Sequence, residues 1–334
     1  MINYLLFAAK RFLQLIAVVF SGVSVAFFVS HLSPIDPVEA AIRRSTRNSN
    51  VNPEAVEKMR ETLTALYGVD VPMWQQFTNF WSKVVVGDFG PSLLSFPTPT
   101  MDLVLRALPW TVGLLLVTIL VTWCIGNFLG AFAGYFQDNK YLKTFGLVTM
   151  SIQPIPYYIV AFLTLMLLAF IWPILPLGGG YAIGLVQEWS WVFVLSVMKH
   201  AILPILSLIM VGLGLWFLGM RALVSNIISE DYVVFAELAG VSKPKIVISY
   251  VMRNALVPQL TALAMAIGGI FSGTVITEQV FSYPGLGSLL VRAVNSGDYT
   301  LVLAVSSVAV AAVAVAIFIV DLLHPLLDPR IKVE

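Results

Sequence analysis

The sequence predicts an all-α polytopic membrane protein, and three observations lead to this fold class. Only 11% of the 334 residues are charged, whereas about 25% is usual in soluble domains. Hydrophobic residues make up 59% of the chain, more than the core of a soluble fold of this size could bury. Six charge-free intervals reach the roughly 20 apolar residues that a membrane-spanning helix needs. We therefore expect six transmembrane helices, with the excess apolar side chains facing lipid.

Each of the six intervals has at least 19 consecutive uncharged residues: Phe12–Ser30, Ala107–Gln137, Thr144–Gln187, Ala201–Met220, Asn254–Thr277 and Tyr299–Val320. The third is long enough for more than one span, but Trp172-Pro173 and the glycines at 178–180 end helices. We therefore predict one span over Thr144–Ile171. The ten residues Trp189–Met198 are too short to cross, and we expect them to lie at the interface or to cap the fourth span.

The basic residues beside the spans predict that both termini lie in the cytoplasm. Short cytoplasmic loops carry an excess of Lys and Arg, and ten such residues fall on one side: Lys10, Arg11, Lys140, Lys143, Arg221, Lys243, Lys245, Arg253, Arg330 and Lys332. The short loops opposite hold Arg292, with Lys199 beside them. The 19-residue apolar stretch after Arg11 exceeds the roughly 7 to 15 residues of a signal peptide, so we expect the first span to be retained.

The segment between the first two spans is the one stretch with a soluble composition. Pro53–Leu66 has helical spacing of its apolar residues, with Asn52 as the expected N-cap and Gly68 beyond its end. A second helix is expected over Pro72–Val86. We predict three consecutive parts: the N-terminus and first helix (1–31), an outer cap (32–106), and a core with five further helices and a cytoplasmic loop at 221–253 (107–334).

Several chemistries are excluded. The chain has no Gly-Lys pair and hence no phosphate-binding loop of the P-loop type. One cysteine and three histidines offer no disulfide, metal site or catalytic group, and a net charge of +1 does not favour nucleic acid. The predicted spans are nearly free of ionisable residues, which disfavours an ion relay. Their amides Asn127, Gln153 and Gln259 either form helix-to-helix hydrogen bonds or line a translocation path.

The cytoplasmic connection Arg221–Arg253 has readable helix signals. Ser229 is expected to cap a short helix that begins with Glu230 and Asp231, because acidic side chains suit the positive end of a helix dipole. The helix should end at Gly240, since glycine readily adopts the left-handed conformation common at helix ends.

This short helix would present an apolar run, Tyr232–Phe235, on the aqueous side of the membrane. Such a surface should be covered. Either the helix folds back on the ends of the spans, or it docks a cytosolic partner, and composition leaves both open. Ser242 and Pro244 then begin a second helix that leads into the next span.

At these residues the chain resembles the permease subunits of binding-protein-dependent ABC importers, in particular the dipeptide/oligopeptide permease family. Members carry a cytoplasmic Glu-Ala-Ala loop, a glycine at fixed spacing and a later Leu-Pro. Ala236, Gly240 and Pro258 match this pattern. Val234 and Phe235 replace the glutamate and the first alanine, and Glu237 is the candidate for the missing acidic contact.

Other matches extend the resemblance over nearly the whole chain. They include Leu66-Tyr67-Gly68, Gly87-Asp88-Phe89-Gly90-x-Ser92, Arg106-x-x-Pro109-x-Thr111, Ile155-Pro156, His200-Ala201-Ile202-Leu203-Pro204, Phe281-Ser282-Tyr283-Pro284-Gly285-Leu286-Gly287, Asp298-Tyr299 and Asp328-Pro329-Arg330-Ile331. The long outer segment resembles the B-type partner of the usual B/C permease pair.

The resemblance implies a type I importer permease in the bacterial inner membrane. Its expected partners are a homologous second permease, two ABC ATPases that bind ATP and Mg, a periplasmic solute-binding protein and lipid; no cofactor and no enzymatic activity are expected in this chain. The implied ATPase-coupling residues are Asp231, Tyr232, Val234, Phe235, Ala236, Glu237, Gly240 and Pro258. The turn Tyr283, Pro284, Gly285, Leu286 and Gly287 either faces the binding protein or only closes the chain between spans.

The expected solute is of the oligopeptide class. Oligosaccharide is the alternative, because Gly179-Gly180-Tyr181 and Trp216–Arg221 resemble members assigned to oligosaccharides. A stand-alone carrier or channel is disfavoured by the absence of buried charge and of a visible inverted repeat. A ligand-binding receptor is disfavoured because the outer region of 76 residues, His31–Arg106, is small.

Overall fold

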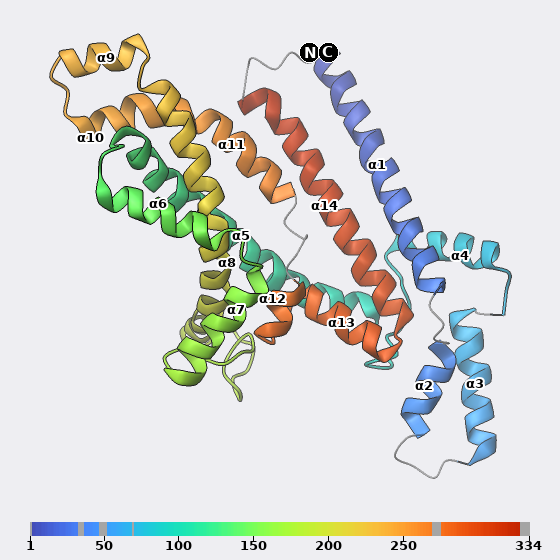
Figure 1. Cartoon of the computed structure of the whole chain (residues 1–334). Coiled ribbons are helices and arrows are strands. Elements are labelled where there is room, and N and C mark those ends of the chain that lie inside the picture. Colours follow the sequence, from blue (N-terminus) through green and yellow to red (C-terminus); the bar gives the residue numbers. More distant parts are fainter. Residues whose placement is uncertain (1, 33–36, 47–51, 69, 269–274, 328–334) are drawn as a thin grey trace. The chain divides into compact units, whose positions relative to one another are not determined.

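The computed structural model describes residues 2–32, 37–46, 52–68, 70–268 and 275–327 (Figure 1). Within these ranges the backbone forms helices and one isolated bridge, between Pro91 and Pro99, with no strand. The helices are α1 (Ile2–His31), α2 (Pro37–Thr46), α3 (Pro53–Tyr67), α4 (Met73–Val86), α5 (Thr100–Tyr135), α6 (Lys140–Ile152), α7 (Tyr157–Leu165), η1 (Met166–Ile171), α8 (Trp191–Ile227), α9 (Asp231–Leu238), α10 (Lys243–Ile246), η2 (Val247–Met252), α11 (Arg253–Gly268), α12 (Val275–Val280), α13 (Leu286–Ser296) and α14 (Tyr299–Leu327).

Five stretches of the described chain are long and apolar enough to cross a membrane: Leu6–His31, Thr100–Tyr135, Trp191–Ile227, Lys243–Gly268 and Tyr299–Leu323. A sixth span is present if the bent pair of helices between residues 140 and 171 crosses as one. The predicted all-α polytopic membrane fold is confirmed. Residues 269–274 of the predicted fifth span lie outside the described residues. So do Arg330 and Lys332, two of the ten basic residues that predict the cytoplasmic side.

The third predicted span is not one continuous helix. Lys140–Ile152 and Tyr157–Ile171 meet at 105°, with Pro154 and Pro156 at the break. Proline has no N–H for the helical ladder and restricts the residue before it, so two prolines this close end the first helix. Of the two alternatives for Trp189–Met198, the structure supports the second, because Trp191–Met198 forms the first turns of α8, the helix of the fourth span.

By its internal contacts the chain forms two units. Unit 1 comprises residues 1–12, 112–283 and 315–334, and unit 2 comprises residues 13–111 and 284–314. Each unit therefore combines segments that are far apart in the sequence. The predicted division into three consecutive parts stays a prediction.

In unit 1, three glycines of α5 allow close packing against α8. A Cβ added at Gly126, Gly130 or Gly134 would lie only 2.5–2.7 Å from an atom of α8. The glycines recur every four residues, the small-residue spacing that brings membrane helices together. This contact positions the C-terminal ends of α5 and α8, beside which α9 lies.

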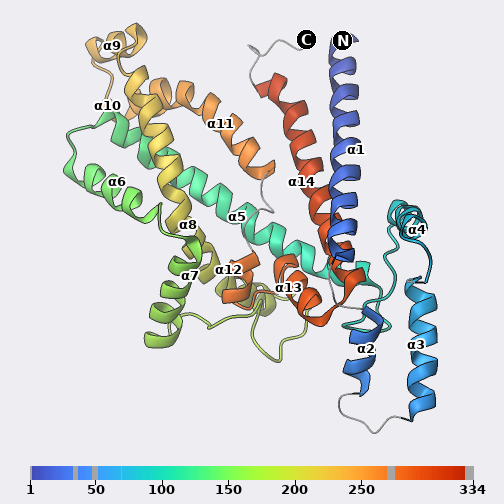
Figure 2. The same cartoon turned by 45° about the vertical axis from the view of Figure 1, so that its right-hand side comes forward.

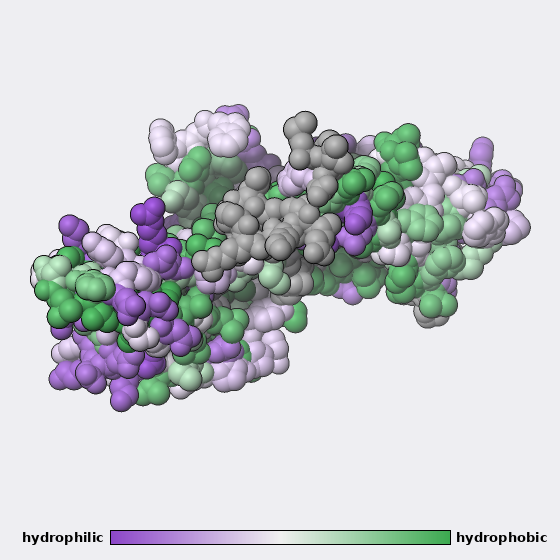
Figure 3. Space-filling view, turned by 90° about the horizontal axis from the view of Figure 1, so that it is seen from above, coloured by the Kyte–Doolittle hydropathy of each residue, from purple (hydrophilic) through white to green (hydrophobic). Residues whose placement is uncertain are grey.

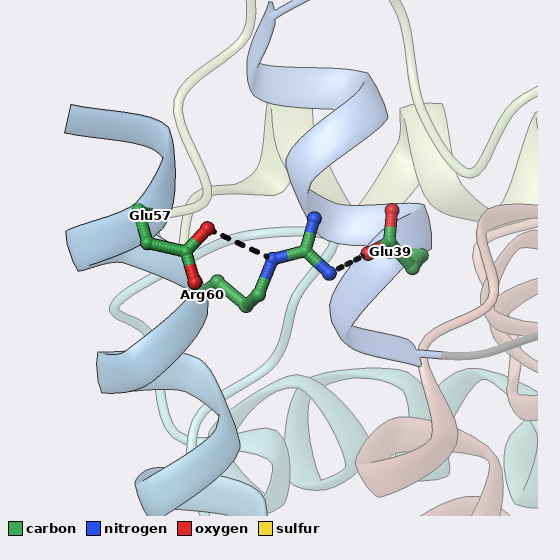
Figure 4. A network of polar contacts seen from close by, with 3 residues as sticks. All are labelled: Glu39, Glu57 and Arg60. Carbon is green, nitrogen blue, oxygen red and sulfur yellow. Dashed lines mark hydrogen bonds and ion pairs between the residues drawn. The ribbon is translucent and has the colours of Figure 1, made fainter. Parts of the chain in front are cut away.

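In unit 2, α2 and α3 pack through a small core of their own: Val38, Ala41, Ile42 and Leu63. The predicted caps of α3 are confirmed, because the Asn52 side chain accepts from the Glu54 N–H and Gly68 has a φ of +60°. Arg60 of α3 pairs with Glu39 of α2 and with Glu57 of its own helix (Figure 4). The predicted second helix is confirmed as α4, whereas α2 was not predicted.

Two motifs of unit 2 that are 206 positions apart form one buried hydrogen-bond network. The Asp298 carboxylate is fully buried and accepts from Ser92 Oγ at 2.6 Å and from the Leu94 N–H at 2.8 Å. Its other oxygen accepts from Thr300 Oγ1 and from the Leu301 N–H. A buried carboxylate is stable only when its oxygens are satisfied, so Asp298 fastens the loop before α5 to the start of α14.

Candidate functional site

The candidate site is the short helix α9 and the helix ends beneath it, all within unit 1. The helix begins at Asp231, with Glu230 at the N-cap position and no side-chain capping bond. The predicted cap, Ser229, is therefore wrong: its hydroxyl instead donates to the Asn226 carbonyl at 3.1 Å. Ser229 stands one residue before the N-cap position, so its side chain does not cap α9.

The predicted end of α9 at Gly240 is confirmed. Gly240 has a φ of +74° and donates its N–H to the Glu237 carbonyl, while the Val241 N–H reaches the Ala236 carbonyl. These two bonds form a Schellman motif, which satisfies carbonyls at a helix end and requires a left-handed residue that glycine supplies. The chain therefore turns sharply after α9 and enters α10.

One face of α9 is buried. Val233 is fully buried and Ala236 nearly so. They belong to a core whose other members come from five helices, namely Ala131 of α5, Met220 and Val224 of α8, Ile246 of α10, Val247 and Val251 of η2, and Ala255 of α11. Helix α9 is thus in contact with three of the stretches that are long and apolar enough to cross a membrane.

The opposite face of α9 is apolar and exposed. Phe235 is 69% exposed and Leu238 80%, and Tyr232 and Val234 are also exposed. Seen from above, the end of unit 1 that carries α9 and α10 shows apolar patches among many hydrophilic residues (Figure 3). The two interpretations that the sequence left open are therefore compatible, because the helix packs on the span ends and still presents an uncovered surface.

Two side-chain hydrogen bonds fasten the ends of α9 to membrane helices. The Tyr135 hydroxyl at the end of α5 donates to the Glu237 carboxylate, and Asn254 Nδ2 of α11 donates to the Tyr232 hydroxyl at 3.0 Å. Glu237 thus contacts α5. Sequence reasoning missed Tyr135, which lies 102 positions from Glu237, a separation at which no local pattern signals a contact.

Pro258, the matched proline, lies inside α11. Its missing N–H removes the helical bond to the carbonyl of Asn254, the residue whose side chain holds Tyr232. The turns before it are a π-helix, η2, and single π-helical turns often mark functional sites. The support beneath α9 is therefore irregular helix, which sequence periodicity did not predict.

Among the predicted pathway residues, the structure brings Asn127 and Gln259 together through Trp123. Trp123 donates its indole N–H to the Gln259 carbonyl at 3.1 Å, and its own carbonyl accepts from Asn127 Nδ2 at 2.8 Å. Asn127 is 1% exposed, and its Oδ1 has no hydrogen-bond partner within the described residues. Gln153 lies elsewhere, at the end of α6 opposite Gly214 of α8. Their role in a pathway stays a prediction.

The turn predicted to face a binding protein is largely buried within this chain. Tyr283 and Leu286 are 3% exposed, and the Leu286 N–H donates to Thr111 Oγ1 at 2.8 Å. Burial, together with the Glu278 carboxylate, raises the pKa of Tyr283 to about 12, so its hydroxyl stays protonated. Gly285 and Gly287 are buried, and Pro284 is partly exposed. The assignment of this turn to a partner stays a prediction.

Comparison with known proteins identifies the family. Over 332 residues the chain is 24% identical to the dipeptide transport system permease protein of Lactococcus lactis, covering 99% of this chain and 100% of the relative. It is 28% identical to a probable D,D-dipeptide transport system permease protein of Escherichia coli, with 96% of each covered. It is 25% identical to an oligopeptide transport system permease protein of Bacillus subtilis, covering 97% of this chain and 98% of the relative. Residues 126–333, well over half of the chain, match one family model, and the chain therefore belongs to the binding-protein-dependent transport system inner membrane components.

Proposed function

We propose that this chain is the permease subunit of an ABC importer that carries a solute of the peptide class into the cytoplasm. The family supports the importer, and the printed functions of the relatives, dipeptide and oligopeptide transport, support the solute class. They do not favour the oligosaccharide alternative. The observation that carries the proposal is α9, a short helix buried on one face, exposed on the other, and hydrogen-bonded to two spans.

The proposed assembly contains a second, homologous permease, two ATPase subunits that bind ATP and Mg, and a solute-binding protein. In this assembly α9 lies on the cytoplasmic side, as do both termini, and its exposed residues Phe235 and Leu238 contact an ATPase. When ATP binding brings the ATPases together, α9 moves with its ATPase. The buried face and the bonds of Glu237 and Tyr232 pass this movement to α5 and α11, which lead to the proposed pathway residues Asn127 and Gln259. Such gating requires a rigid element between two packings of the spans.

On the opposite side, the binding protein is proposed to contact the exposed residues of α3 together with the turn at Pro284. The buried residues of the turn would hold its shape, while α3 exposes charged side chains such as Glu57 and Lys58. This arrangement needs no catalytic group in the chain.

The test is Phe235→Asp in the assembled importer, reconstituted in lipid with its binding protein and a peptide. Removal of an aromatic anchor from an interface costs about 2 kcal/mol or more, so we expect substrate-stimulated ATP hydrolysis to fall at least about tenfold. Phe235→Leu is the matched control, because it keeps an apolar side chain and should retain most of the stimulation. Normal stimulation in Phe235→Asp would contradict the coupling role of α9.

The solute class is tested separately with the binding protein. A thermal-shift screen should raise its melting temperature with di- or oligopeptides and not with oligosaccharides. A shift with oligosaccharides alone would overturn the peptide assignment and leave the coupling role of α9 intact.

A further inference from the structure

Helix α4 of unit 2 packs across α1 inside the membrane-crossing part of α1. The Phe77 ring is buried against Phe27 at 5.4 Å between centroids. The Trp81 ring stacks on Phe20 at 4.9 Å, and its indole N–H donates to Ser24 Oγ at 3.3 Å. In both ribbon views α4 lies beside the His31 end of α1 and runs across its axis (Figures 1 and 2).

The contacts of α4 with α1 and α14 show how far α4 lies from the ends of these two helices. Ser24 precedes His31, the last residue of α1, by seven positions, or about 10 Å at 1.5 Å per residue. On α14, Leu303 packs with Phe77 in one core and follows Tyr299, the first residue of that helix, by about 6 Å. The rings of Tyr299 and His31 lie 6.5 Å apart, so the two helix ends are level. Helix α4 therefore lies about 5–10 Å inside these ends, the depth at which interfacial amphipathic helices lie.

Most of the exposed side chains of α4 are sorted by polarity; the exception is Val86, the last residue of the helix, which is 75% exposed and lies among the polar residues. At about 100° per residue, Trp74, Trp81 and Val85 fall within about 40° of one another on one flank of the helix. Trp74 is 71% exposed and Val85 79%. The exposed polar residues Gln75 and Ser82 lie about 60° or more further round. One flank therefore suits hydrocarbon and the other water.

The apolar flank continues an exposed apolar surface on the membrane-crossing part of α1. In the same unit α1 exposes Leu13, Ile16 and Phe20, which lie within about 60° of one another on the helix, and Phe20 is the residue on which Trp81 stacks. An exposed apolar surface that joins the lipid-facing side of a span, at the depth of the interface, is expected to be covered by lipid. Tryptophan is also enriched at this level of membranes.

We propose that α4 is a membrane-interface helix. Its apolar flank, formed by Trp74, Trp81 and Val85, binds the lipid of the leaflet at the His31 end of α1. Its polar flank faces water. The helix thereby fixes the depth of α1 and leaves α2 and α3 to project beyond the membrane.

The test places a nitroxide spin label on each flank. In a Cys124→Ser background, Val85→Cys and Ser82→Cys replace exposed residues of the same helix one turn apart. The full chain, purified with the subunits that accompany it, is labelled and placed in nanodiscs of phosphatidylethanolamine and phosphatidylglycerol. Power saturation then compares collisions with oxygen, which concentrates in lipid, and with a water-soluble nickel chelate.

We expect the label at position 85 to collide several-fold more with oxygen than with the nickel chelate, and the label at position 82 to show the reverse. Preferential collision with nickel at position 85 would overturn the proposal, because α4 would then lie in water. Protection of position 85 from both reagents would overturn it as well, because a protein partner would then cover the flank. Coelution of each variant with the native assembly checks that the fold is retained.

Discussion

Helix α9 and the pair α2–α3 are both short helical elements outside the spans, but their buried side chains have different partners. Val233 and Ala236 of α9 pack on α5, α8, η2 and α11, so the helix cannot move without displacing them. The buried residues of α2 and α3 pack mainly on one another. The difference supports the proposed role of α9 in passing movement to the membrane helices, and it marks α2–α3 as a small module with a core of its own.

The largest expected effect separates the two faces of α9. Val233→Asp places an unpaired charge in a core with no exposure, which costs about 3–5 kcal/mol, and should abolish recovery of folded protein. Phe235→Asp changes an exposed residue and should alter stability by only about 0.5 kcal/mol or less. Thermal unfolding in detergent, followed by size-exclusion fluorescence, measures both. Equal losses in the two variants would contradict the division into a packing face and a docking face.

The next effect should stay local. Leu63→Ala removes buried methyl groups from the α2–α3 core, at a cost of about 2–5 kcal/mol. Hydrogen exchange followed by mass spectrometry should show faster exchange in α2 and α3 and unchanged protection in α9. If protection in α9 falls as well, α2–α3 is not the independent module that its contacts indicate.

The smallest effect concerns the ion pairs of Figure 4. Arg60 is about half exposed, and exposed ion pairs contribute about 0–1 kcal/mol. Arg60→Ala should therefore raise the exchange rate of α2–α3 far less than Leu63→Ala does. The effect should shrink further at high salt, because salt screens surface charges. An effect as large as that of Leu63→Ala would show that the charges, and not the apolar core, hold the pair together.

Local rules predicted what depends on local residues. The length of the charge-free intervals located the spans. Asn52 and Gly68 located the ends of α3, and Gly240 located the end of α9, because capping signals act within a few residues. The 105° break at Gln153–Pro156 was missed, although Pro154 and Pro156 stand in the sequence, because the length of the apolar interval outweighed them. From the sequence, it could not be decided whether Tyr232–Phe235 packs on the span ends or docks a partner. The burial of these residues depends on residues of other helices.

The contacts between segments that are distant in the sequence could not be predicted from local signals. Tyr135 and Glu237, or Ser92 and Asp298, lie more than 100 positions apart, and neither pair has a periodicity that joins it. The resemblance marked Ser92 and Asp298 as parts of two motifs, but only the fold shows that one hydrogen-bonds the other. The C-terminal end of α9 was therefore predictable from local residues, whereas the residues of other helices that support α9 were not.

The proposed contact between the exposed face of α9 and an ATPase subunit can be tested by site-specific photocrosslinking. A benzoylphenylalanine at position 235, in the full importer in native membranes, should form an adduct with the ATPase. The same group at position 96, an exposed phenylalanine of unit 2, should form none. An ATPase adduct at position 235 alone is the predicted result. Its absence in an importer shown to be assembled, or equal adducts at both positions, would contradict the account.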